Sequence, residues 1–282
     1  MKNGQRDNAA SLNKAEFTFI CQFVYDMTGI VLTEQKREMV YRRLTRIVRE
    51  RKLISFSAYC ELLKADPAGE KTYFINAITT NLTSFFREQH HFDYMSQHEL
   101  PQLLKANLNN KRLRIWSSAS STGEEPYSIA MTLYEIMHNV IDRWDVKILA
   151  TDIDSNVLAQ GKAGTYSSSC LDGIPINLRN KYFSKGNGKN LNSVKVSEKL
   201  MKLITFKQLN LLDEWPMKGP FDIIFCRNVI IYFDKETQLG LFRRYFDLLA
   251  PGGLLILGHS ENLGVFQQYF KNEGRTIFRK PI

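Results

Sequence analysis

The stretch RLRIWSSASSTGEEPYSIAMTLYEIM, residues 112–137, decides the fold of this chain. Its first part, RLRIWSS, reads as a β-strand, and its last part is an amphipathic helix in which Ile129, Leu133 and Ile136 are expected to face the core. The loop between them has a single glycine, Gly123, where a dinucleotide-binding fingerprint needs three, and the two acids that follow it would repel phosphate. The segment therefore predicts a ligand site without a phosphate cradle.

Strand and helix patterns alternate through the rest of the C-terminal part of the chain. Further strands are expected at DVKILATDID (145–154), KLITFKQLNLL (202–212), FDIIFCRN (221–228), LLILGHSEN (254–262) and RTIFRK (275–280). A helix that begins at Lys235 is expected to be closed by Pro251 and the two glycines after it. This alternation predicts an α/β domain over residues 96–282, with a doubly wound, Rossmann-like sheet. Ligands of such sheets bind outside the carboxyl ends of the strands.

The first part of the chain is expected to form a small all-helical domain over residues 1–85, with a linker to about residue 95. Three helices are expected, at KAEFTFICQFVYDMTG (14–29), EQKREMVYRRLTRIVRERK (34–52) and SFSAYCELLKADP (55–67). Ser55 is expected to cap the third helix and Pro67 to end it.

One interval interrupts the alternation of strands and helices. Residues 166–203 contain a Gly-Asn-Gly turn and the alternating run SVKVS. We expect a small antiparallel β insertion at about residues 170–203, and insertions of this type usually carry specificity.

The chain is basic, with a formal net charge of +9 and a pI near 9.3. This excess predicts an acidic partner, which composition leaves open among nucleic acid, an anionic membrane and an acidic protein surface. The helix at 34–52 concentrates the charge, with eight Lys or Arg against three Glu, and Arg42, Arg46 and Arg49 share one face. An ordinary solvated helix face is the alternative interpretation.

Several classes of protein and site are disfavoured. No apolar run approaches the roughly 20 residues that span a bilayer, and the first dozen residues lack the apolar core of a secretory signal. We therefore expect a cytoplasmic protein without membrane insertion. The four cysteines form no C-x-x-C pair, and the five histidines have no matching ligand spacing, so we expect neither disulfides nor a metal site.

Polar side chains follow four of the expected strands. Glu125, Asp152 and Asn210 are placed at successive strand ends, and Arg227 and Asn228 follow a fourth strand. Acids and amides without a phosphate cradle suit a nucleoside with a cationic tail. S-adenosylmethionine fits, because Glu125 can meet its ammonium group, Asp152 its ribose hydroxyls and Asn210 its adenine edge.

Each of these signals is weak when taken singly. An acid after a strand is often a solvated loop residue, Glu124 and Glu125 can simply complement a helix N-terminus, and the acids at 152 and 154 can cap a helix. The recurrence of polar residues at four strand ends favours the cofactor site.

Six motifs in one order make the resemblance to a known family specific. They are TNLTSFFRE (80–88), STGEEPYSIAM (121–131), ATDID (150–154), NLL (210–212), FDIIFCRNVIIYFD (221–234) and GHSEN (258–262). With them the chain resembles, over almost its whole length, the CheR family of chemotaxis receptor glutamate O-methyltransferases. The loop SSASS is poorer in glycine and alanine than in some members, but its side chains are still small.

The resemblance implies roles for individual residues. The TNLTSFFRE segment links two domains in the family and closes over the cofactor. The positions implied to bind the cofactor are Asn81, Thr83, Arg87, Glu125, Asp152, Asn210, Leu211, Arg227 and Asn228. Arg87 and Tyr232 are implied to lie near the transferred methyl group.

The implied reaction moves a methyl group from S-adenosylmethionine to glutamate carboxylates of chemotaxis receptors, leaving S-adenosylhomocysteine and glutamyl methyl esters. A glutamate with a pKa of about 4.3 is ionised at pH 7, so no general base is expected. The basic face of Arg42, Arg46 and Arg49 suits acidic receptor helices. The β insertion resembles the docking subdomain that binds a receptor C-terminal peptide in some members.

The residues by themselves leave two other functions open. One is a methyltransferase for RNA or small molecules, although basic residues at 34–52 are accompanied by a single aromatic, Tyr41, so we expect no nucleic-acid partner. The other is a non-catalytic receptor-binding module, against which the presence of Glu125, Asp152, Arg87 and Tyr232 argues.

Overall fold

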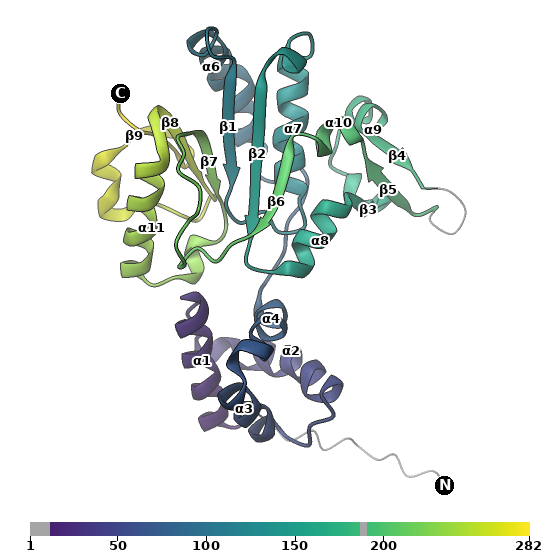
Figure 1. The fold of residues 1–282 in the computed structure, drawn as a ribbon, viewed down its shortest axis with the longest axis vertical. Coiled ribbons are helices and arrows are strands. Elements are labelled where there is room, and N and C mark those ends of the chain that lie inside the picture. Colours follow the sequence, from purple (N-terminus) through teal and green to yellow (C-terminus); the bar gives the residue numbers. More distant parts are fainter. Residues whose placement is uncertain (1–11, 187–190) are drawn as a thin grey trace. The chain divides into compact units, whose positions relative to one another are not determined.

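The computed structural model describes residues 12–186 and 191–282, in two compact units. One unit runs to Thr80 and includes Tyr232–Asp234, and the other comprises Asn81–Ile231 and Lys235–Ile282. The α/β sheet preceded by an all-helical domain confirms the predicted fold class (Figure 1).

The helical unit is built from α1 (Lys14–Thr28), the 3-10 turn η1 (Glu34–Lys36), α2 (Arg37–Glu50), α3 (Phe56–Ala65) and α4 (Pro67–Ile78). α1 begins with a capping box between Asn13 and Glu16 and ends at Gly29, whose φ of 69° is left-handed. The predicted cap of the third helix is confirmed, since Ser55 Oγ accepts from the backbone N–H of Ala58 at 3.1 Å. Apolar faces of these helices meet in one core, which includes Ile20, Val24, Leu44, Leu63 and Phe74.

The third helix ends before Pro67, as predicted, but Pro67 begins a further helix that was not expected. Pro67 is the first residue of α4, and Asp66 Oδ1 caps that helix by accepting from the N–H of Gly69 at 2.9 Å. Proline is favoured at this first position, where its missing N–H would have had no intrahelical partner. The signal that stops one helix thus starts the next.

The larger unit is centred on a seven-stranded sheet in the order β6-β2-β1-β7-β8-β10-β9 within the described residues. Its strands are β1 (Arg112–Ser117), β2 (Asp145–Asp152), β6 (Ile204–Gln208), β7 (Phe221–Cys226), β8 (Leu249–Leu257), β9 (Lys271–Gly274) and β10 (Ile277–Arg279). The first five in sheet order are parallel, and β10 and β9 complete the sheet antiparallel. All six residues of β7 are buried, as expected of a central strand covered on both faces.

Two parts of this sheet differ from the prediction. β9 has the polar sequence KNEG, which carries no strand pattern, and it forms through its pairing with β10. β8 begins at Leu249, so that Pro251 and the two glycines lie within the strand and not at the end of α11 (Lys235–Leu248). The bounds of β8 are set by its backbone pairing with β7, and they cannot be predicted from the preferences of its residues.

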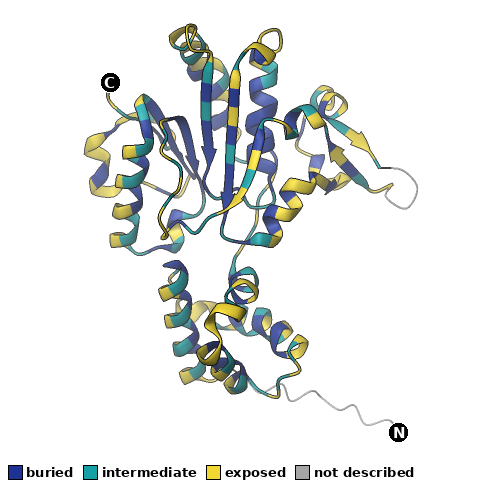
Figure 2. Ribbon diagram, viewed as in Figure 1, coloured by how far each residue is buried: buried dark blue, intermediate teal, exposed yellow. Residues whose placement is uncertain are grey.

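Helices cover the sheet on both sides (Figure 1). They are α5 (His90–Tyr94), the π-helical turn η2 (Met95–Glu99), α6 (Leu100–Ala106), α7 (Glu124–Met137), α8 (Ser155–Ala163) and α11. Of the three α7 residues expected to face the core, Ile129 and Leu133 are wholly buried, whereas Ile136 is 36% exposed. Figure 2 shows buried residues concentrated in the central strands and in α7.

The β insertion is a three-stranded antiparallel sheet in the order β3-β5-β4. Its strands are β3 (Thr165–Ser167), β4 (Phe183–Lys185) and β5 (Ser193–Val196). The 3-10 turn η4 (Ser168–Leu171) and α9 (Ile176–Tyr182) lie between β3 and β4 in the sequence, and α10 (Glu198–Met201) follows β5. It therefore begins near residue 165, earlier than the expected 170. Asn187 and Gly188 of the expected Gly-Asn-Gly turn lie outside the described residues.

The small sheet is joined to the loop that follows β1. The Tyr166 hydroxyl donates to the carbonyl of Thr122 at 2.7 Å. The ring of Phe85 packs edge-on against Tyr166 and Phe183, with centroids 5.1 and 5.3 Å apart. The insertion thus supports the strand-end edge of the main sheet.

None of the described helices is long and apolar enough to cross a bilayer. All four cysteines are free thiols, as predicted.

Candidate active site

Parallel pairing brings the ends of the central strands to one edge of the main sheet. Ser117 at the end of β1 is in register with Ala150 of β2 and Phe225 of β7, and Asp152 at the end of β2 is in register with Gln208 of β6. Residues that follow these strands therefore emerge side by side.

The loop after β1 is held tightly by backbone contacts. The N–H of Ser120 donates to the carbonyl of Thr151 at 2.8 Å. Gly123 has a φ of 99°, and an added Cβ would lie 2.9 Å from Gly161 Cα and from the Tyr166 hydroxyl. Gly123 is required by this close approach, which a larger residue would prevent.

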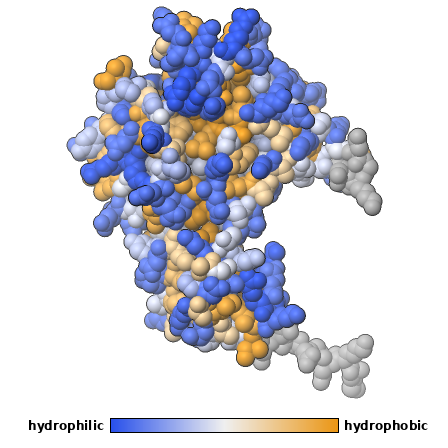
Figure 3. Space-filling model, in the orientation of Figure 1, coloured by the Kyte–Doolittle hydropathy of each residue, from blue (hydrophilic) through white to orange (hydrophobic). Residues whose placement is uncertain are grey.

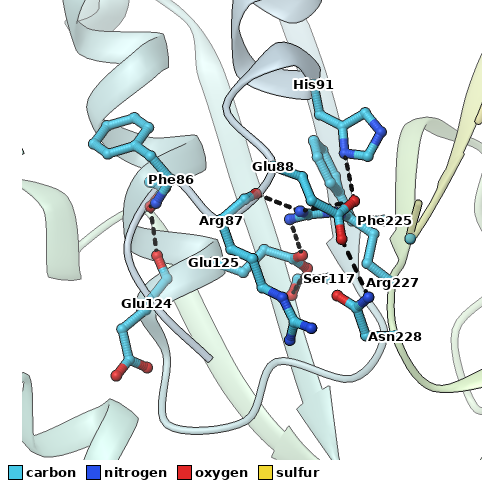
Figure 4. A network of polar contacts seen from close by, with 12 residues as sticks. Phe86, Arg87, Glu88, His91, Ser117, Glu124, Glu125, Phe225, Arg227 and Asn228 are labelled. Atoms are coloured by element: carbon cyan, nitrogen blue, oxygen red, sulfur yellow. Dashed lines mark hydrogen bonds and ion pairs between the residues drawn. The ribbon is translucent and has the colours of Figure 1, made fainter. Parts of the chain in front are cut away.

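Glu125 and Arg227 form a buried ion pair that joins the loop after β1 to the end of β7. Arg227 Nη1 lies 2.8 Å from Glu125 Oε2, and Ser117 Oγ donates to the other carboxylate oxygen at 2.7 Å. Figure 4 shows the pair enclosed between the strand ends. The structure therefore brings together two residues predicted from separate motifs, and gives Glu125 a role beyond complementing the helix N-terminus.

Glu88 is a third charged group at this site that sequence reasoning missed. Its carboxylate accepts from Asn228 Nδ2 at 3.2 Å and contacts His259 Nδ1 at 2.9 Å, and it lies 3.4 Å from Arg227 Nη2 (Figure 4). Burial would raise the pKa of Glu88, but the hydrogen bonds from His259 and Asn228 and the charge of Arg227 lower it to about 2. Two carboxylates facing one guanidinium leave a net negative charge, which suits a cationic ligand.

The two acids of the ATDID motif have different roles. Asp154 caps α8, with Oδ1 accepting from the N–H of Asn156 at 2.8 Å. Asp152 instead accepts from the backbone N–H groups of Ser121 at 2.8 Å and Asp154 at 3.0 Å, at the strand-end edge. Helix capping is thus the role of the second acid, which leaves the first as the ligand-binding candidate.

Cofactor affinity is expected to fall below pH 6. Burial raises the pKa of Asp152 to about 6, against the opposing effect of its backbone hydrogen bonds. As the pH falls through this value the carboxylate gains a proton and loses an acceptor for ribose hydroxyls. Because one proton is linked, the dissociation constant of S-adenosylhomocysteine should rise up to about tenfold per pH unit below 6. Calorimetric titrations between pH 7 and 5 test this. Asp152→Asn should bind S-adenosylhomocysteine more weakly and with less dependence on pH. A wild-type dissociation constant that does not change with pH would contradict the prediction.

The start of the TNLTSFFRE segment is tied to two strand ends. Asn81 Nδ2 donates to Asp154 Oδ2 at 2.7 Å, and the Asn81 carbonyl accepts from Ser121 Oγ at 2.9 Å. Thr83 lies two residues further on and is partly exposed. Asn81 therefore lies beside the loops that carry Asp152 and Glu125, and the ligand role of Thr83 stays a prediction.

The end of the same segment adopts an unusual backbone. Phe86 and Glu88 have left-handed φ values of 53° and 56°, and the Phe86 N–H donates to Ser128 Oγ at 2.9 Å. Arg87 Nη1 donates to the carbonyl of Leu82 at 2.8 Å, and the Arg87 carbonyl accepts from Arg227. Left-handed non-glycine residues persist where surrounding contacts fix them, and they often mark functional sites.

Asn210 and Leu211 follow β6, next to the end of β2. The N–H of Leu209 donates to the Asp152 carbonyl at 2.9 Å and fixes this junction. The Asn210 amide donates to Asp213 Oδ1 at 3.1 Å and shapes its own turn, while Leu211 is buried. Both residues lie at the predicted edge, and their contacts with a cofactor stay a prediction.

Tyr232 is the last residue of the 3-10 turn η6 (Ile230–Tyr232). It groups with the helical unit, where its carbonyl accepts from the N–H of Val31 at 2.8 Å. Its expected position near the transferred methyl group, with Arg87, stays a prediction.

The histidines matter more than their sequence pattern indicated. His91 is completely buried, and its Nε2 lies 3.0 Å from the carbonyl of Arg275. Burial and the nearby charge of Arg227 lower the pKa of His91 to about 3, so the ring is neutral. His259 contacts Glu88. Glu261, the acid of the GHSEN motif, is buried at the same edge. The GHSEN motif contains His259 and Glu261, whereas His91 lies outside the six motifs, and no periodicity distinguishes any of the three from its neighbours.

One group of side chains has metal-ligating atoms close together. The ligand atoms of Glu88, His90 and His91 all lie within 4.8 Å of one another. Arg227 and His259 already contact the Glu88 carboxylate, and Arg227 supplies a cation there. The expectation that the protein needs no metal stays a prediction.

The edge fits the predicted cofactor, S-adenosylmethionine, in charge and in hydrogen-bonding capacity. A carboxylate can accept about four hydrogen bonds, and Glu125 has two charged or polar partners among the described residues, so it can also accept an ammonium group. Ser120 Oγ is buried without a hydrogen-bond partner in that part of the chain, beside the loop that would face the ligand. Such an atom at a strand end is available to a bound polar molecule.

The chain matches two family models and several curated relatives. The model described as "CheR methyltransferase, SAM binding domain" covers residues 81–279, and "CheR methyltransferase, all-alpha domain" covers residues 15–79. A probable chemotaxis protein methyltransferase of Rhizobium etli is 45% identical over 91% of this chain and 96% of its own length. The chemotaxis protein methyltransferases of Salmonella typhimurium and Escherichia coli are 43% and 42% identical, each over 97% of this chain and 93% of the relative.

Proposed function

The chain belongs to the CheR family of S-adenosylmethionine-dependent chemotaxis methyltransferases, and on that premise we propose that its methyl acceptor is a glutamate side-chain carboxylate of a chemotaxis receptor. The observation that supports the proposal is a strand-end edge with three carboxylates and Arg227, which suits a cationic methyl donor. A glutamate acceptor that is already ionised requires no proton transfer. The proposed location is the cytoplasm, where the receptors present their signalling domains.

The reaction requires the protein to position the methyl acceptor and to exclude water. S-adenosylmethionine supplies, when bound, a methyl group on a positively charged sulfur. A carboxylate oxygen of the acceptor forms the new bond to the methyl carbon, while the electron pair of the broken carbon–sulfur bond returns to sulfur and leaves S-adenosylhomocysteine. No proton moves, because the acceptor is ionised at pH 7. Alignment of the two reacting atoms is therefore the main contribution of the protein.

Residue roles follow the family and the contacts at the edge. Glu125 would hold the ammonium group of the cofactor and Asp152 its ribose, while Arg227 orients Glu125. Asn81 and Arg87 would close the TNLTSFFRE segment over the cofactor, and Arg87 would hold the acceptor carboxylate through a charge-assisted hydrogen bond.

A labelling experiment tests the acceptor. The protein is incubated with methyl-labelled S-adenosylmethionine and a receptor cytoplasmic fragment, which is then treated with mild alkali. Label that leaves as volatile methanol identifies a glutamyl methyl ester. Alkali-stable label would exclude an O-methyl ester, and label in added RNA but not in the fragment would favour the rival substrate class. Cofactor binding without transfer to a receptor fragment that contains its methylation helices would favour the non-catalytic module.

The receptor helix is proposed to dock on the exposed face of α2 formed by Arg42, Arg46 and Arg49, all of which are exposed. Arg42 pairs with Glu38 at 2.9 Å and Arg46 with Glu50 at 2.7 Å on the same helix. Exposed pairs of this kind contribute little to stability, so the arginines can exchange partners with an acidic surface at small cost. Figure 3 shows hydrophilic side chains mixed with apolar ones over the visible face of the helical unit.

Charge reversal of that face is expected to weaken receptor binding. The triple variant Arg42→Glu, Arg46→Glu, Arg49→Glu should raise the KM for the receptor fragment at least tenfold at low ionic strength, with less effect at high salt. Cofactor affinity should not change. The control reverses three exposed lysines elsewhere, Lys64, Lys105 and Lys162, for the same change in net charge. Equal losses in both triples would show a general charge effect and contradict a docking face.

The small sheet is proposed to bind a receptor C-terminal peptide along one of its outer strands, β3 or β4. Each is paired on one side, with β5 between them, so an extended peptide can add a strand. Removing the terminal peptide from the receptor should therefore raise the dissociation constant of the full-length enzyme at least tenfold, and a scrambled peptide of equal length should not restore binding. Equal affinities for intact and truncated receptors would contradict tethering.

A further inference from the structure

Glu261, the acid of the GHSEN motif, joins two strand ends through four backbone hydrogen bonds. It is 5% exposed and follows β8. Oε2 accepts from the N–H groups of Gly258 at 2.7 Å and Asn228 at 2.8 Å. Oε1 accepts from Ile230 at 2.8 Å and Ile231 at 3.4 Å. One side chain thereby connects the end of β8 with the segment that follows β7.

The start of the segment after β7 is fixed from two sides. Asn228 has a left-handed φ of 57°, a region that asparagine adopts more readily than most non-glycine residues. Its side-chain amide donates to Glu88 Oε1 at 3.2 Å, so Asn228 is held at its backbone by Glu261 and at its side chain by Glu88. The approach is close, since a Cβ on Gly258 would lie 2.5 Å from Asn228 Nδ2 and 2.8 Å from its backbone nitrogen.

The chemistry of the position calls for a carboxylate. Four N–H donors converge on Glu261, two at each oxygen. A carboxylate is acceptor-only, with about four lone-pair sites, and matches this arrangement. A glutamine has the same shape, but its NH2 group would meet two N–H donors at one of the two positions. The isosteric substitution therefore loses two hydrogen bonds and adds a repulsion between donors.

We propose that Glu261 is a positioning residue for the cofactor site. By fixing Asn228 and the start of η6, it holds Arg227 where that guanidinium meets Glu125 and Glu88. The proposal rests on the proposed cofactor contacts of Arg227, Asn228 and Glu125, and it adds a residue that touches neither cofactor nor acceptor.

Calorimetric titration with S-adenosylhomocysteine tests the proposal directly on the full chain. Glu261→Gln is expected to raise the dissociation constant at least tenfold, and to be no better than Glu261→Ala, because the amide nitrogen faces two donors. The KM for S-adenosylmethionine should rise in parallel, while the KM for the receptor fragment stays within about twofold. The control is Glu273→Gln, which alters a carboxylate of β9 that pairs with Arg279 of β10. This variant should bind S-adenosylhomocysteine within about twofold of wild type. Wild-type affinity in a folded Glu261→Gln would overturn the proposal.

Hydrogen exchange on the wild-type protein gives a second test that needs no folded variant. The amides of Asn228, Ile230 and Ile231, which donate to Glu261, are expected to exchange slowly without cofactor and to change little when S-adenosylhomocysteine is added. Fast exchange that slows only on binding would show that the cofactor orders this segment, and would overturn the role of Glu261. The calorimetric titration and the hydrogen exchange need no receptor, so both are independent of whether glutamate is the methyl acceptor.

Discussion

Replacing Glu125 by alanine is expected to raise the dissociation constant of S-adenosylhomocysteine at least a hundredfold and to lower the free energy of unfolding by about 3 kcal/mol. The loss of affinity follows from its proposed contact with the ammonium group of the cofactor, and the loss of stability follows from its buried ion pair with Arg227 at 2.8 Å. Removing one partner of such a pair leaves an uncompensated buried charge, at a cost of about 3–5 kcal/mol. Glu88, 3.4 Å from Arg227, places the expected loss at the lower end of that range.

Loss of cofactor affinity and loss of stability can be separated. The double variant Glu125→Leu, Arg227→Met replaces the pair by apolar side chains of comparable size, which often restores stability. It should recover part of the stability that Glu125→Ala loses, but not all of it, because Glu88 also loses its contact with Arg227, and it should still fail to bind S-adenosylhomocysteine. The matched control is Glu236→Ala, which removes an exposed glutamate from the first turn of α11, as Glu125 lies in the first turn of α7. Glu125→Ala with wild-type affinity would remove Glu125 from the cofactor site.

Replacing Arg87 by alanine is expected to lower turnover about ten- to a hundredfold while the affinity for S-adenosylhomocysteine changes less. A hydrogen bond to a charged group contributes about 1.5–3 kcal/mol, and each 1.4 kcal/mol corresponds to a factor of ten. The Arg87 side chain also donates to the carbonyl of Leu82 at 2.8 Å, which accounts for part of any loss in binding.

Two further variants separate these contributions. Arg87→Gln keeps a donor within the segment but removes the charge, and Arg87→Lys keeps the charge but not the planar fork. If Arg87 holds the acceptor carboxylate, the lysine variant should retain more turnover than the glutamine variant, at saturating cofactor and receptor. Single-turnover rates measure this difference. Unchanged rates in Arg87→Ala would remove Arg87 from the acceptor site, and would leave its carbonyl contact with Arg227 as its contribution.

Local pattern was sufficient for most elements, because a helix or a strand repeats its apolar residues at a fixed period. The strands at 112–118 and 221–228 and the helix of 124–137 were predicted within a few residues of the observed bounds. Two elements, α4 and β9, were not predicted. Pro67 both ends one helix and begins another, and the polar strand β9 has no period of its own.

The cofactor side of the site was also largely visible in the sequence. Parallel strands deliver their carboxyl ends to one edge, so Glu125, Asp152 and Arg227 could be assigned to one site before their distances were known. Which of the two ATDID acids caps α8 could not be assigned, because both have the spacing of a cap. The structure gives that role to Asp154 through its bonds to the first turn of the helix.

The sequence by itself determined the fold class, the order of the two domains and the set of acids at the strand ends, since these depend on periods and on residue type. Only the tertiary structure decided what those acids bond to. Glu88 and Glu261 converge on Asn228 from segments 140 and 33 residues away along the chain. No local preference encodes such a meeting. It arises because buried donors and acceptors must be satisfied once the strands have packed, and the partners available are whichever groups the sheet brings together.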